Sequence, residues 1–397
     1  MAILSVNAGS SSLKFSLYPL QAGQVHPQVL SGNIEGLEPG GAPTMRWTYQ
    51  VQNYSQTLRL GTEHVFAQAL LSLRDLLADL PGVPTINAVA HRVVHGAAMY
   101  RASMVVTDDV LAQLTQFNSL APLHQPHNLE GIRAFRQAFA SLPQIACFDT
   151  AFHATLPEVD YRFALPEALY QQGLRRYGFH GLSYQYVIGV LQQQTGRASG
   201  RVLMAHLGNG ASMCAALDGK SCATTMGFSA LEGLMMGTRT GSLDAGVLLY
   251  LLEQGWDHAR LQTLLYKQSG LLGVSGISAD MRRLRADASV SAKLATDMFT
   301  YRVVRESGAM VACLQGLDVL AFSGGIGEHD VALRAEVAEK LAWMGIEIDP
   351  QRNAQAIADS VMAIHTPASR VEVWVVPTDE GVVVAREAAR LLQLTSA

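Results

Sequence analysis

The stretch NAGSSSLK at residues 7–14 lies between two apolar runs, Ile3 to Val6 and Phe15 to Tyr18. Its position predicts the turn of a tight β-hairpin, lined with backbone amides, serine hydroxyls and the ammonium group of Lys14. These groups can all point at one anion, which is typical of a phosphate-binding turn. It is not a Walker A loop, because Phe15 follows the lysine and a strand, not a helix, follows the turn. A plain polar hairpin turn is the alternative.

The same pattern returns later in the chain as VLMAHLGNGASM at residues 202–213. An apolar strand again leads into a turn of Gly, Asn and Ser, and another apolar strand follows. We therefore expect an internally duplicated α/β chain.

Length and composition indicate two globular domains that bind small ligands. The 397 residues are 49% hydrophobic, enough to bury two cores. The balance of 33 acidic against 29 basic residues, without a Lys/Arg run longer than two, argues against nucleic acid and anionic membranes as partners.

Cysteine usage and the first residues point to the cytoplasm. Four scattered cysteines lack CxxC spacing and are typical of thiols in a reducing compartment: Cys147, Cys214, Cys222 and Cys313. The first apolar run lacks a basic segment before it and is broken at Asn7, so we expect a first strand and no signal peptide. No stretch approaches the ~18 apolar residues of a membrane span.

Both halves of the chain are predicted to follow one order of elements. In the first half we expect strands within 1–60, 88–94 and 144–148 and helices at 64–80, 108–118 and 128–138. In the second half we expect strands within 201–226, 319–323 and 371–376 and helices within 243–268, 290–315 and 382–392. The turn GGIG at 324–327 stands between a strand and a helix, which indicates a nucleotide site.

Three charged residues mark strand ends or interiors. Asp149 and Glu380 each follow a predicted strand, and carboxylates at such positions are the hard oxygen ligands that Mg²⁺ prefers. Capping of the next turn or helix is the alternative for either one. Arg92 lies inside an apolar strand, where a permanently charged guanidinium must meet an anion, either a protein carboxylate or a ligand.

Two further residues are candidates for contact with phosphate. Arg239 lies on the glycine-flanked loop GTRTG at 237–241, and His180 follows two arginines in RRYGFHG at 175–181. A zinc site is not expected, because His91 and His95 on one strand lie about 13 Å apart.

Nine motifs together resemble the acetate kinase family of short-chain acyl kinases, and the resemblance covers essentially the whole chain. They are VNAGSSSLKF at 6–15, HRVVHG at 91–96, FDTAFH at 148–153, RRYGFHG at 175–181, HLGNGAS at 206–212, LEGLMMGTRTG at 231–241, LLGVSGIS at 271–278, SGGIGE at 323–328 and PTDEG at 377–381.

The resemblance implies the duplicated actin-like ATPase fold of acetate and sugar kinases, heat-shock proteins and actin, with two domains around a nucleotide cleft. We expect an N-terminal domain of residues 1–149 plus 382–397 and a C-terminal domain of residues 150–381 with most of the nucleotide site. ATP as co-substrate, Mg²⁺ with Mn²⁺ as an alternative, and a homodimer are also implied.

The resemblance also implies the roles of individual residues. Catalysis is assigned to Arg92, Asp149, His180 and Arg239. The metal and its surroundings are assigned to Asn7, Asp149 and Glu380. The acyl substrate is assigned to Arg92, Val94, Leu123, Phe179 and Ala230. The nucleotide is assigned to Lys14, His206, Leu207, Gly208, Asn209, Gly210, Asp280, Met281, Arg282, Gly325, Ile326, Gly327 and His329.

Some positions depart from the family pattern. His329 stands where Asn usually follows the GIGE turn, which bears on nucleotide preference. Ala230 stands where a proline is expected before LEGLMMGTR, which touches the acyl pocket.

The expected reaction is in-line transfer of the γ-phosphoryl group of ATP to acetate, reversibly, giving acetyl phosphate and ADP. A carboxylate is already ionised at pH 7, so no general base is needed. Propionate kinase, a sugar kinase or phosphatase on the same fold, and a non-catalytic ATP switch are the alternatives.

Overall fold

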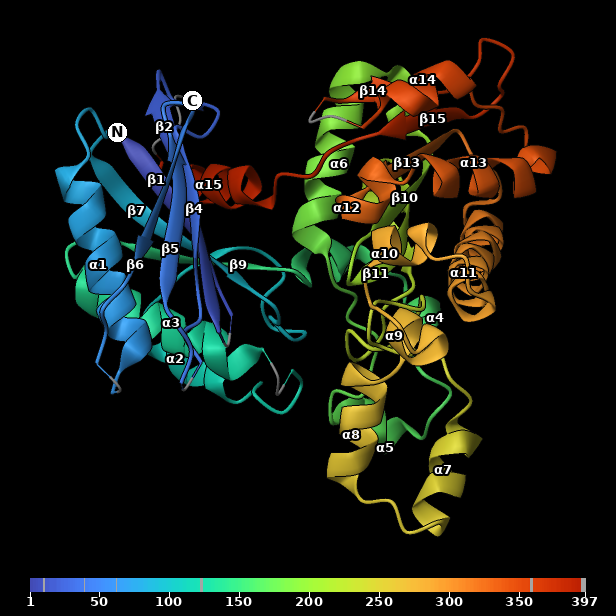
Figure 1. The fold of residues 1–397 in the computed structure, drawn as a ribbon, viewed down its shortest axis with the longest axis horizontal. Coiled ribbons are helices and arrows are strands. Elements are labelled where there is room, and N and C mark those ends of the chain that lie inside the picture. Colours follow the sequence, from blue (N-terminus) through green and yellow to red (C-terminus); the bar gives the residue numbers. More distant parts are fainter. Residues whose placement is uncertain (10, 39, 62, 122–123, 358–359, 394–397) are drawn as a thin grey trace. The chain divides into compact units, whose positions relative to one another are not determined.

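The chain folds into two compact units, shown in a computed structural model that describes all residues except 10, 39, 62, 122–123, 358–359 and 394–397 (Figure 1). Unit 1 comprises Met1–Ala151 and Asp379–Ala397, and unit 2 comprises Phe152–Thr378. Glu380 therefore belongs to unit 1. None of the helices in the described part of the chain is long and apolar enough to cross a bilayer.

Unit 1 is built on a mixed sheet. Its strands are β1 (Ala2–Ala8), β2 (Ser12–Gln21), β3 (Gln24–Val25), β4 (Leu30–Glu35), β5 (Thr44–Tyr49), β6 (Gln52–Thr57), β7 (Ile86–Val93), β8 (Met104–Val105) and β9 (Gln144–Phe148). Their order is β6-β5-β4-β2-β1-β7-β9-β8, with β3 beside β2. The central strands β1, β7 and β9 run parallel, whereas β1 and β2 form the predicted hairpin up to the pair Ala8↔Leu13.

Helices cover both faces of this sheet (Figure 1). They are α1 (Val65–Asp79), α2 (Asp108–Thr115), α3 (Gln125–Ala138) and α15 (Glu380–Leu391). Alternate residues of a strand point to opposite faces. Accordingly Phe148 of β9 packs in one cluster with residues of α2 and α3, whereas Cys147 contacts the Val384 carbonyl of α15. Both faces of β9 are therefore covered by packed helices.

Unit 2 carries a second sheet and most of the helices. Its strands are β10 (Arg201–Leu207), β11 (Ala211–Leu217), β12 (Lys220–Thr224), β13 (Val319–Ser323), β14 (Met362–Ala363) and β15 (Glu372–Val375). Its α-helices are α4 (Glu158–Tyr161), α5 (Glu167–Gln171), α6 (Gly181–Gln194), α7 (Ala245–Glu253), α8 (His258–Lys267), α9 (Gly270–Ser275), α10 (Met281–Ala286), α11 (Val290–Leu314), α12 (Gly324–His329), α13 (Val331–Lys340) and α14 (Pro350–Gln355). Short 3₁₀ turns add Ala151–Thr155, Gly196–Ser199 and Ala342–Met344.

The sheet of unit 2 has the order β12-β11-β10-β13-β15-β14 and lies between α6 and α11. Cys214 of β11 packs with α6, whereas its neighbour Met213 accepts a weak hydrogen bond from Ser307 of α11. The run β11-β10-β13-β15 repeats the run β2-β1-β7-β9 in order and direction. This repeat confirms the duplicated α/β fold expected from the two glycine-rich hairpins.

Candidate active site

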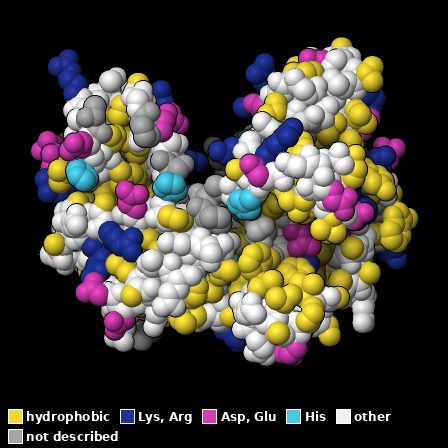
Figure 2. All heavy atoms as spheres, turned by 90° about the horizontal axis from the view of Figure 1, so that it is seen from below, with side chains coloured by type: hydrophobic (Ala, Val, Ile, Leu, Met, Phe, Trp, Pro, Cys, Tyr) yellow, Lys and Arg dark blue, Asp and Glu magenta, His cyan; other side chains and the backbone are white. Residues whose placement is uncertain are grey.

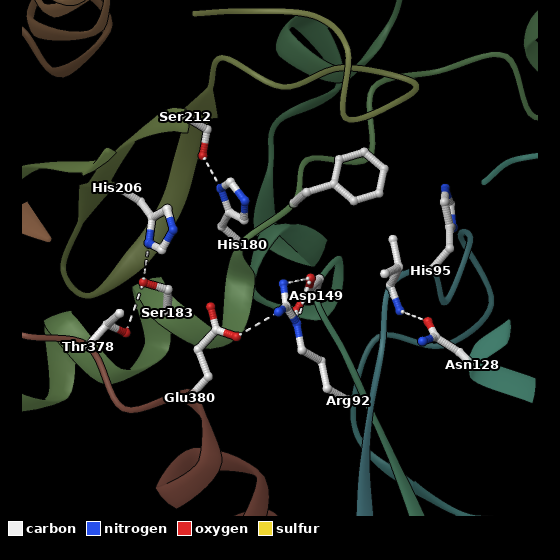
Figure 3. Close-up of polar contacts among 12 residues, drawn as sticks. Arg92, His95, Asn128, Asp149, His180, Ser183, His206, Ser212, Thr378 and Glu380 are labelled. Atoms are coloured by element: carbon white, nitrogen blue, oxygen red, sulfur yellow. Dashed lines mark hydrogen bonds and ion pairs between the residues drawn. The ribbon is translucent and has the colours of Figure 1, made fainter. Parts of the chain in front are cut away.

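The first part of the site is an arginine of unit 1 shared by two carboxylates. Arg92 lies near the end of β7, next to β9, so Asp149 at the end of β9 is its neighbour. Arg92 Nη2 lies 2.7 Å from Asp149 Oδ2, and Nη1 lies 3.0 Å from Glu380 Oε2 (Figure 3). The guanidinium of this largely buried side chain, which is 22% exposed, therefore meets protein carboxylates, one of the two possibilities that the sequence left open.

The charges of this cluster do not cancel. Burial by itself would lower the pKa of Arg92, but attraction by Asp149 and Glu380 outweighs it and raises the pKa above its usual value. The guanidinium therefore stays protonated. One guanidinium faces two carboxyl groups, so acidic groups outnumber the basic one in this cluster. The cluster therefore favours a further cation.

Glu380 reaches this position because a helix begins earlier than the sequence predicted. We expected a helix from 382, but α15 starts at Glu380 itself. The side chain of Asp379 accepts a hydrogen bond from the Val382 amide at 3.0 Å and so caps the helix. Asp379, and not Glu380, makes the capping bond, so the carboxylate of Glu380 is left for Arg92.

The cluster fits a magnesium ion held by few protein ligands. Among the described residues, no group of three or more His, Cys, Asp or Glu side chains is arranged to hold a metal. Mg²⁺ commonly takes only one or two carboxylates and completes its shell with waters and phosphate oxygens. Asp149 and Glu380 supply such a pair, and Asn7 lies on β1, the other neighbour of β7.

Asn128 of α3 holds the ends of β1 and β7 together. Its Oδ1 accepts from the Val94 amide at 3.0 Å and its Nδ2 donates to the Ala8 carbonyl at 2.7 Å (Figure 3). These bonds position Val94, one of the residues assigned to the acyl substrate in this unit. Leu123 lies outside the described residues.

In unit 2 the second glycine-rich turn brings His180 and Arg239 together. A Cβ on Gly210 would lie 2.8 Å from Arg239 Nη2 and 3.4 Å from His180 Nε2. The guanidinium of Arg239 and the imidazole of His180 therefore both flank the backbone of this turn. Residues 180, 210 and 239 come from three separate motifs, so the fold assembles a phosphate-type site from segments far apart in sequence.

Among the described residues, Arg239 is a cation that pairs with no carboxylate. Burial lowers its pKa. Nη1 donates to the Ala230 carbonyl at 2.6 Å, and none of the described carboxylates forms an ion pair with it. A buried guanidinium in this situation is stabilised when an anionic ligand arrives. The contact also links Arg239 to Ala230, the position that departs from the family pattern.

His180 is oriented by a hydroxyl network. It has a left-handed backbone, φ 58°, directly before α6. Its Nδ1 lies 2.9 Å from Ser212 Oγ, which also contacts the Tyr184 hydroxyl (Figure 3). Its ring lies 4.3 Å from that of His206. Ser212 and Tyr184 were not singled out in the sequence, although Ser212 lies inside the HLGNGAS motif.

Hydrogen bonds connect His206 through Ser183 to Thr378, the last residue of unit 2. Its Nδ1 lies 2.8 Å from Ser183 Oγ, and Thr378 Oγ1 donates to the same oxygen at 3.1 Å (Figure 3). Glu328 Oε1 accepts from the amides of Gly324 and Thr378 at 2.8 and 3.0 Å. The first residue of α12 and the last residue of the unit are thus tied to one carboxylate. The prediction of a turn at 324–327 is therefore wrong, because these glycines begin the helix directly after β13.

A cavity of about 970 Å³ lies beside the Gly208–Asn209 turn of unit 2. This volume suits a nucleotide-sized ligand. Its lining consists of Gly208, Asn209, Ala279, Asp280, Met281, Arg282, Arg285, Gly325, Ile326, His329, Asp330 and Val331. Most of the positions that the resemblance assigns to the nucleotide are included.

Other assigned positions are not on that lining, and some lining residues were missed. Outside it are Lys14, His206, Leu207, Gly210 and Gly327, of which Lys14 lies exposed on β2 of unit 1. Arg285 was missed; it pairs with Asp330 at 3.2 Å and with Glu336 at 2.7 Å. Nothing in the sequence marks this arginine, because its partners lie on another helix.

The chain is similar to known proteins along nearly its whole length. The Acetokinase family profile matches residues 2–386. An acetate kinase of Rhodopseudomonas palustris is 49% identical over 400 residues, covering 98% of both chains. The crystal structure of a propionate kinase from Francisella tularensis superposes with a TM-score of 0.89 at 35% identity, covering 97% of this chain and 98% of that one. An acetate kinase structure from Porphyromonas gingivalis gives a TM-score of 0.88 at 36% identity, covering 98% and 99%.

Fold and site together define a phosphotransferase with the duplicated actin-like ATPase fold, acting on a carboxyl group. Within that class, the chain belongs to the acetokinase family.

Proposed function

We propose that this protein transfers the γ-phosphoryl group of ATP to the carboxylate of acetate, reversibly, giving acetyl phosphate and ADP. The observation that carries the proposal is the meeting of Arg239 and His180 at the Gly210 backbone. Both groups flank the turn that contains Gly208 and Asn209, the two residues before Gly210, and these two residues line a nucleotide-sized cavity.

In the forward step, an acetate oxygen forms a bond to the γ-phosphorus while the bond from that phosphorus to the β,γ-bridging oxygen breaks. The nucleophile is ionised at neutral pH, so no side chain has to remove a proton. The loose transition state spreads negative charge over three equatorial oxygens. Arg239 and His180 would donate hydrogen bonds to them, which is stabilisation that water cannot preorganise.

The charged cluster of unit 1 would hold the metal ion. Asp149 and Glu380, with Asn7 nearby, would take Mg²⁺, with Mn²⁺ as an alternative, directly or through its waters. When bound, the ion neutralises phosphate charge. Arg92 fixes both carboxylates and would also attract the substrate carboxylate.

The acyl group is assigned separately in each unit. In unit 1 it is assigned to Val94 and Leu123, and in unit 2 to Phe179, which is buried, and to Ala230. Propionate is the second candidate substrate, favoured by the small side chain at 230, where the family pattern has proline.

A hydroxylamine trap tests the reaction directly. With ATP, Mg²⁺ and acetate, acetyl phosphate should form acetohydroxamate, which gives a coloured ferric complex. Formation of ADP without hydroxamate would indicate a phosphatase or an ATP switch instead. Phosphorylation of a hexose without hydroxamate would indicate a sugar kinase.

Replacement of Glu380 by Ala tests the metal assignment. We expect the Mg²⁺ concentration for half-maximal activity to rise about tenfold, because one hard ligand is lost. The KM for acetate should change much less. Glu387, on the same helix, pairs with Arg390 at 2.9 Å, so Glu387→Ala is a matched control. An unchanged metal requirement in Glu380→Ala would assign Glu380 to a structural role with Arg92.

We also propose that the protein is a homodimer that associates through α7. This nine-residue helix is mostly apolar and contains no buried residue. Leu249, Tyr250 and Leu252 are 62%, 59% and 49% exposed. Figure 2 views the molecule from the end at which α7 lies and shows hydrophobic side chains gathered there. A second copy presenting the same helix would cover them.

Sedimentation of the wild type and of Leu249→Glu tests this association. The wild type should sediment with twice the mass of one chain. The Leu249→Glu variant should sediment with the mass of a single chain. Leu294→Glu, at an exposed position on α11 that is 51% accessible, is the control. A monomeric wild type would refute the dimer.

The proposed location is the cytoplasm. All four cysteines are free thiols, including the exposed Cys313, as expected in a reducing compartment. Alkylation of intact, fractionated cells should find the protein and its thiols in the cytoplasmic fraction; recovery from the periplasm would contradict this.

A further inference from the structure

His329 lies on the wall of the cavity with its protonation pattern set by the backbone. Nδ1 lies 3.0 Å from the Ile357 carbonyl oxygen. A carbonyl oxygen can only accept a hydrogen bond, so Nδ1 must carry the hydrogen. In the neutral ring, Nε2 is then an acceptor. Among the described residues, no side chain or backbone group donates to Nε2.

His329 lies at the other end of α12 from the glycines that face the Gly208 turn. Gly208 marks the phosphate side, and a Cβ on it would lie 3.9 Å from the Gly325 amide nitrogen, at the start of α12. His329 ends α12, four residues later, which corresponds to about 6 Å along the helix. A nucleotide with its phosphates at the glycine turn would extend its nucleoside towards His329.

The bond between His329 and Ile357 is held at both ends by Arg334, whose side chain is fully buried. Its Nη1 donates to the carbonyls of Gly327 and Glu328 at 2.9 and 2.8 Å. These carbonyls directly precede His329.

Nη2 of Arg334 donates to the carbonyls of Asn353 and Ala356, each at 2.9 Å, and Nε donates to Asn353 Oδ1 at 2.8 Å. These groups precede Ile357. All five donors of the guanidinium are therefore used, and the segments that carry His329 and Ile357 are clamped to one rigid group.

The carboxylates on the cavity wall are paired with cations. Asp280 Oδ2 lies 2.7 Å from Arg282 Nη2, and Asp330 Oδ2 lies 3.2 Å from Arg285 Nε. Nε2 of His329 therefore differs from these acceptors, because it combines a fixed direction with no described partner.

We propose that His329 selects the purine base by accepting a hydrogen bond at Nε2 from the 6-amino group of adenine. A 6-oxo purine would place a second acceptor against Nε2 and is disfavoured. This inference rests on the proposed function in one respect, that the cavity holds a nucleotide; it adds which base is taken and which residue reads it.

Calorimetric binding of ADP, IDP and purine riboside diphosphate tests the selection without turnover. The wild type should bind ADP about tenfold more tightly than IDP, the value of one net hydrogen bond, with the unsubstituted purine between them. In His329→Leu the three affinities should lie within about twofold of one another. Because binding is measured, loss of acetate phosphorylation alone would refute the proposed function and leave this inference standing.

Two further variants separate base reading from structural effects. The His329→Asn variant should bind ADP and IDP about equally well, because its side-chain amide can rotate to present either a donor or an acceptor to the base. His258→Leu, the same change at an exposed histidine of α8, should keep the wild-type ratio. An unchanged ratio in His329→Leu, an equal loss for all three ligands, or a wild type without preference for ADP would overturn the proposal.

Discussion

The two units share one ladder of strands but use the same strand ends for different chemistry. In unit 1, Asn7 of β1 pairs with Lys14, in the last residue pair but one of the β1–β2 hairpin. In unit 2, His206 of β10 pairs with Ser212 at the same place in the β10–β11 hairpin. The parallel neighbours also correspond, since Val6 pairs with His91 and Ala205 pairs with Phe322.

From these pairs, Arg92 of unit 1 occupies the position of Ser323 in unit 2. One strand carries near its end a guanidinium shared by two carboxylates, and the other runs into the glycine-rich start of α12, which borders a cavity. The repeated backbone fixes where side chains gather, while charge in one copy and glycine in the other decide what they bind.

The largest expected effect comes from removing Arg239, a cation of unit 2 that pairs with none of the described carboxylates. Arg239→Ala should lower kcat about 10³-fold, because a guanidinium that stabilises a transferring phosphoryl group is worth this much. Steady-state kinetics with ATP and acetate measures it.

Arg239→Lys keeps the charge but loses the planar fork, so it should recover only part of the rate. Near-normal turnover in the alanine variant would remove Arg239 from the mechanism and leave catalysis to the charged cluster of unit 1.

Buried arginines serve the two units differently, and this difference can be tested through stability. Arg92 contacts carboxylates, whereas Arg334 donates only to carbonyl and amide oxygens. Burial lowers the pKa of Arg334 to about 10. Arg334→Met should reduce the free energy of unfolding by about 3 kcal/mol, since buried acceptors lose their donors.

Urea unfolding monitored by circular dichroism measures this loss. Arg201→Met is the control, because Arg201 forms a half-exposed ion pair with Asp318 that should contribute less than about 1 kcal/mol. Equal losses in the two variants would show that Arg334 is no more than an ordinary surface arginine.

The hairpins and strand exits could be predicted from sequence because their signals are local. Two-residue alternation and a glycine-rich turn specify a hairpin, and a lone arginine in an apolar strand requires an anion. Asn128 and Arg334 gave no such signal. The amide of Asn128 bonds the Ala8 carbonyl 120 residues away, and Arg334 bonds backbone oxygens, which every residue possesses.

Both units contain buried histidines that should make the free energy of unfolding depend on pH. Burial lowers the pKa of His91 and His95 in unit 1 to about 4, and that of His153 in unit 2 likewise to about 4. The unfolded chain, with pKa values near 6.5, binds more protons than the folded one between about pH 6.5 and 4. Stability is therefore complete above pH 6.5 and decreases as the pH falls through this range.

Replacing one of these histidines measures how much it contributes to the pH dependence of the free energy of unfolding. Between pH 7 and pH 5 the wild type should lose about 2 kcal/mol per buried histidine. His91→Leu should therefore show a loss smaller by about that amount in urea unfolding, whereas His258→Leu, at an exposed histidine, should follow the wild type. Parallel curves for His91→Leu and the wild type would mean that His91 titrates alike in both states.

The smallest expected effect is on the preference between acetate and propionate, and it involves Ala230, whose carbonyl contacts Arg239. One extra methylene in an apolar pocket is worth only ~1–3 kcal/mol, and alanine in place of proline leaves more room. We expect kcat/KM for acetate and propionate to lie within about tenfold, a difference of ~1.4 kcal/mol. Ala230→Pro should shift the ratio towards acetate.

Proline keeps the carbonyl that Arg239 Nη1 binds at 2.6 Å but restricts the backbone that presents it. If residue 230 acted only by moving Arg239, Ala230→Pro would slow both substrates equally, since the guanidinium serves the phosphoryl group and not the acyl chain. A changed ratio at similar kcat for acetate therefore assigns residue 230 to acyl length. An unchanged ratio, with both rates reduced, assigns it to the support of Arg239.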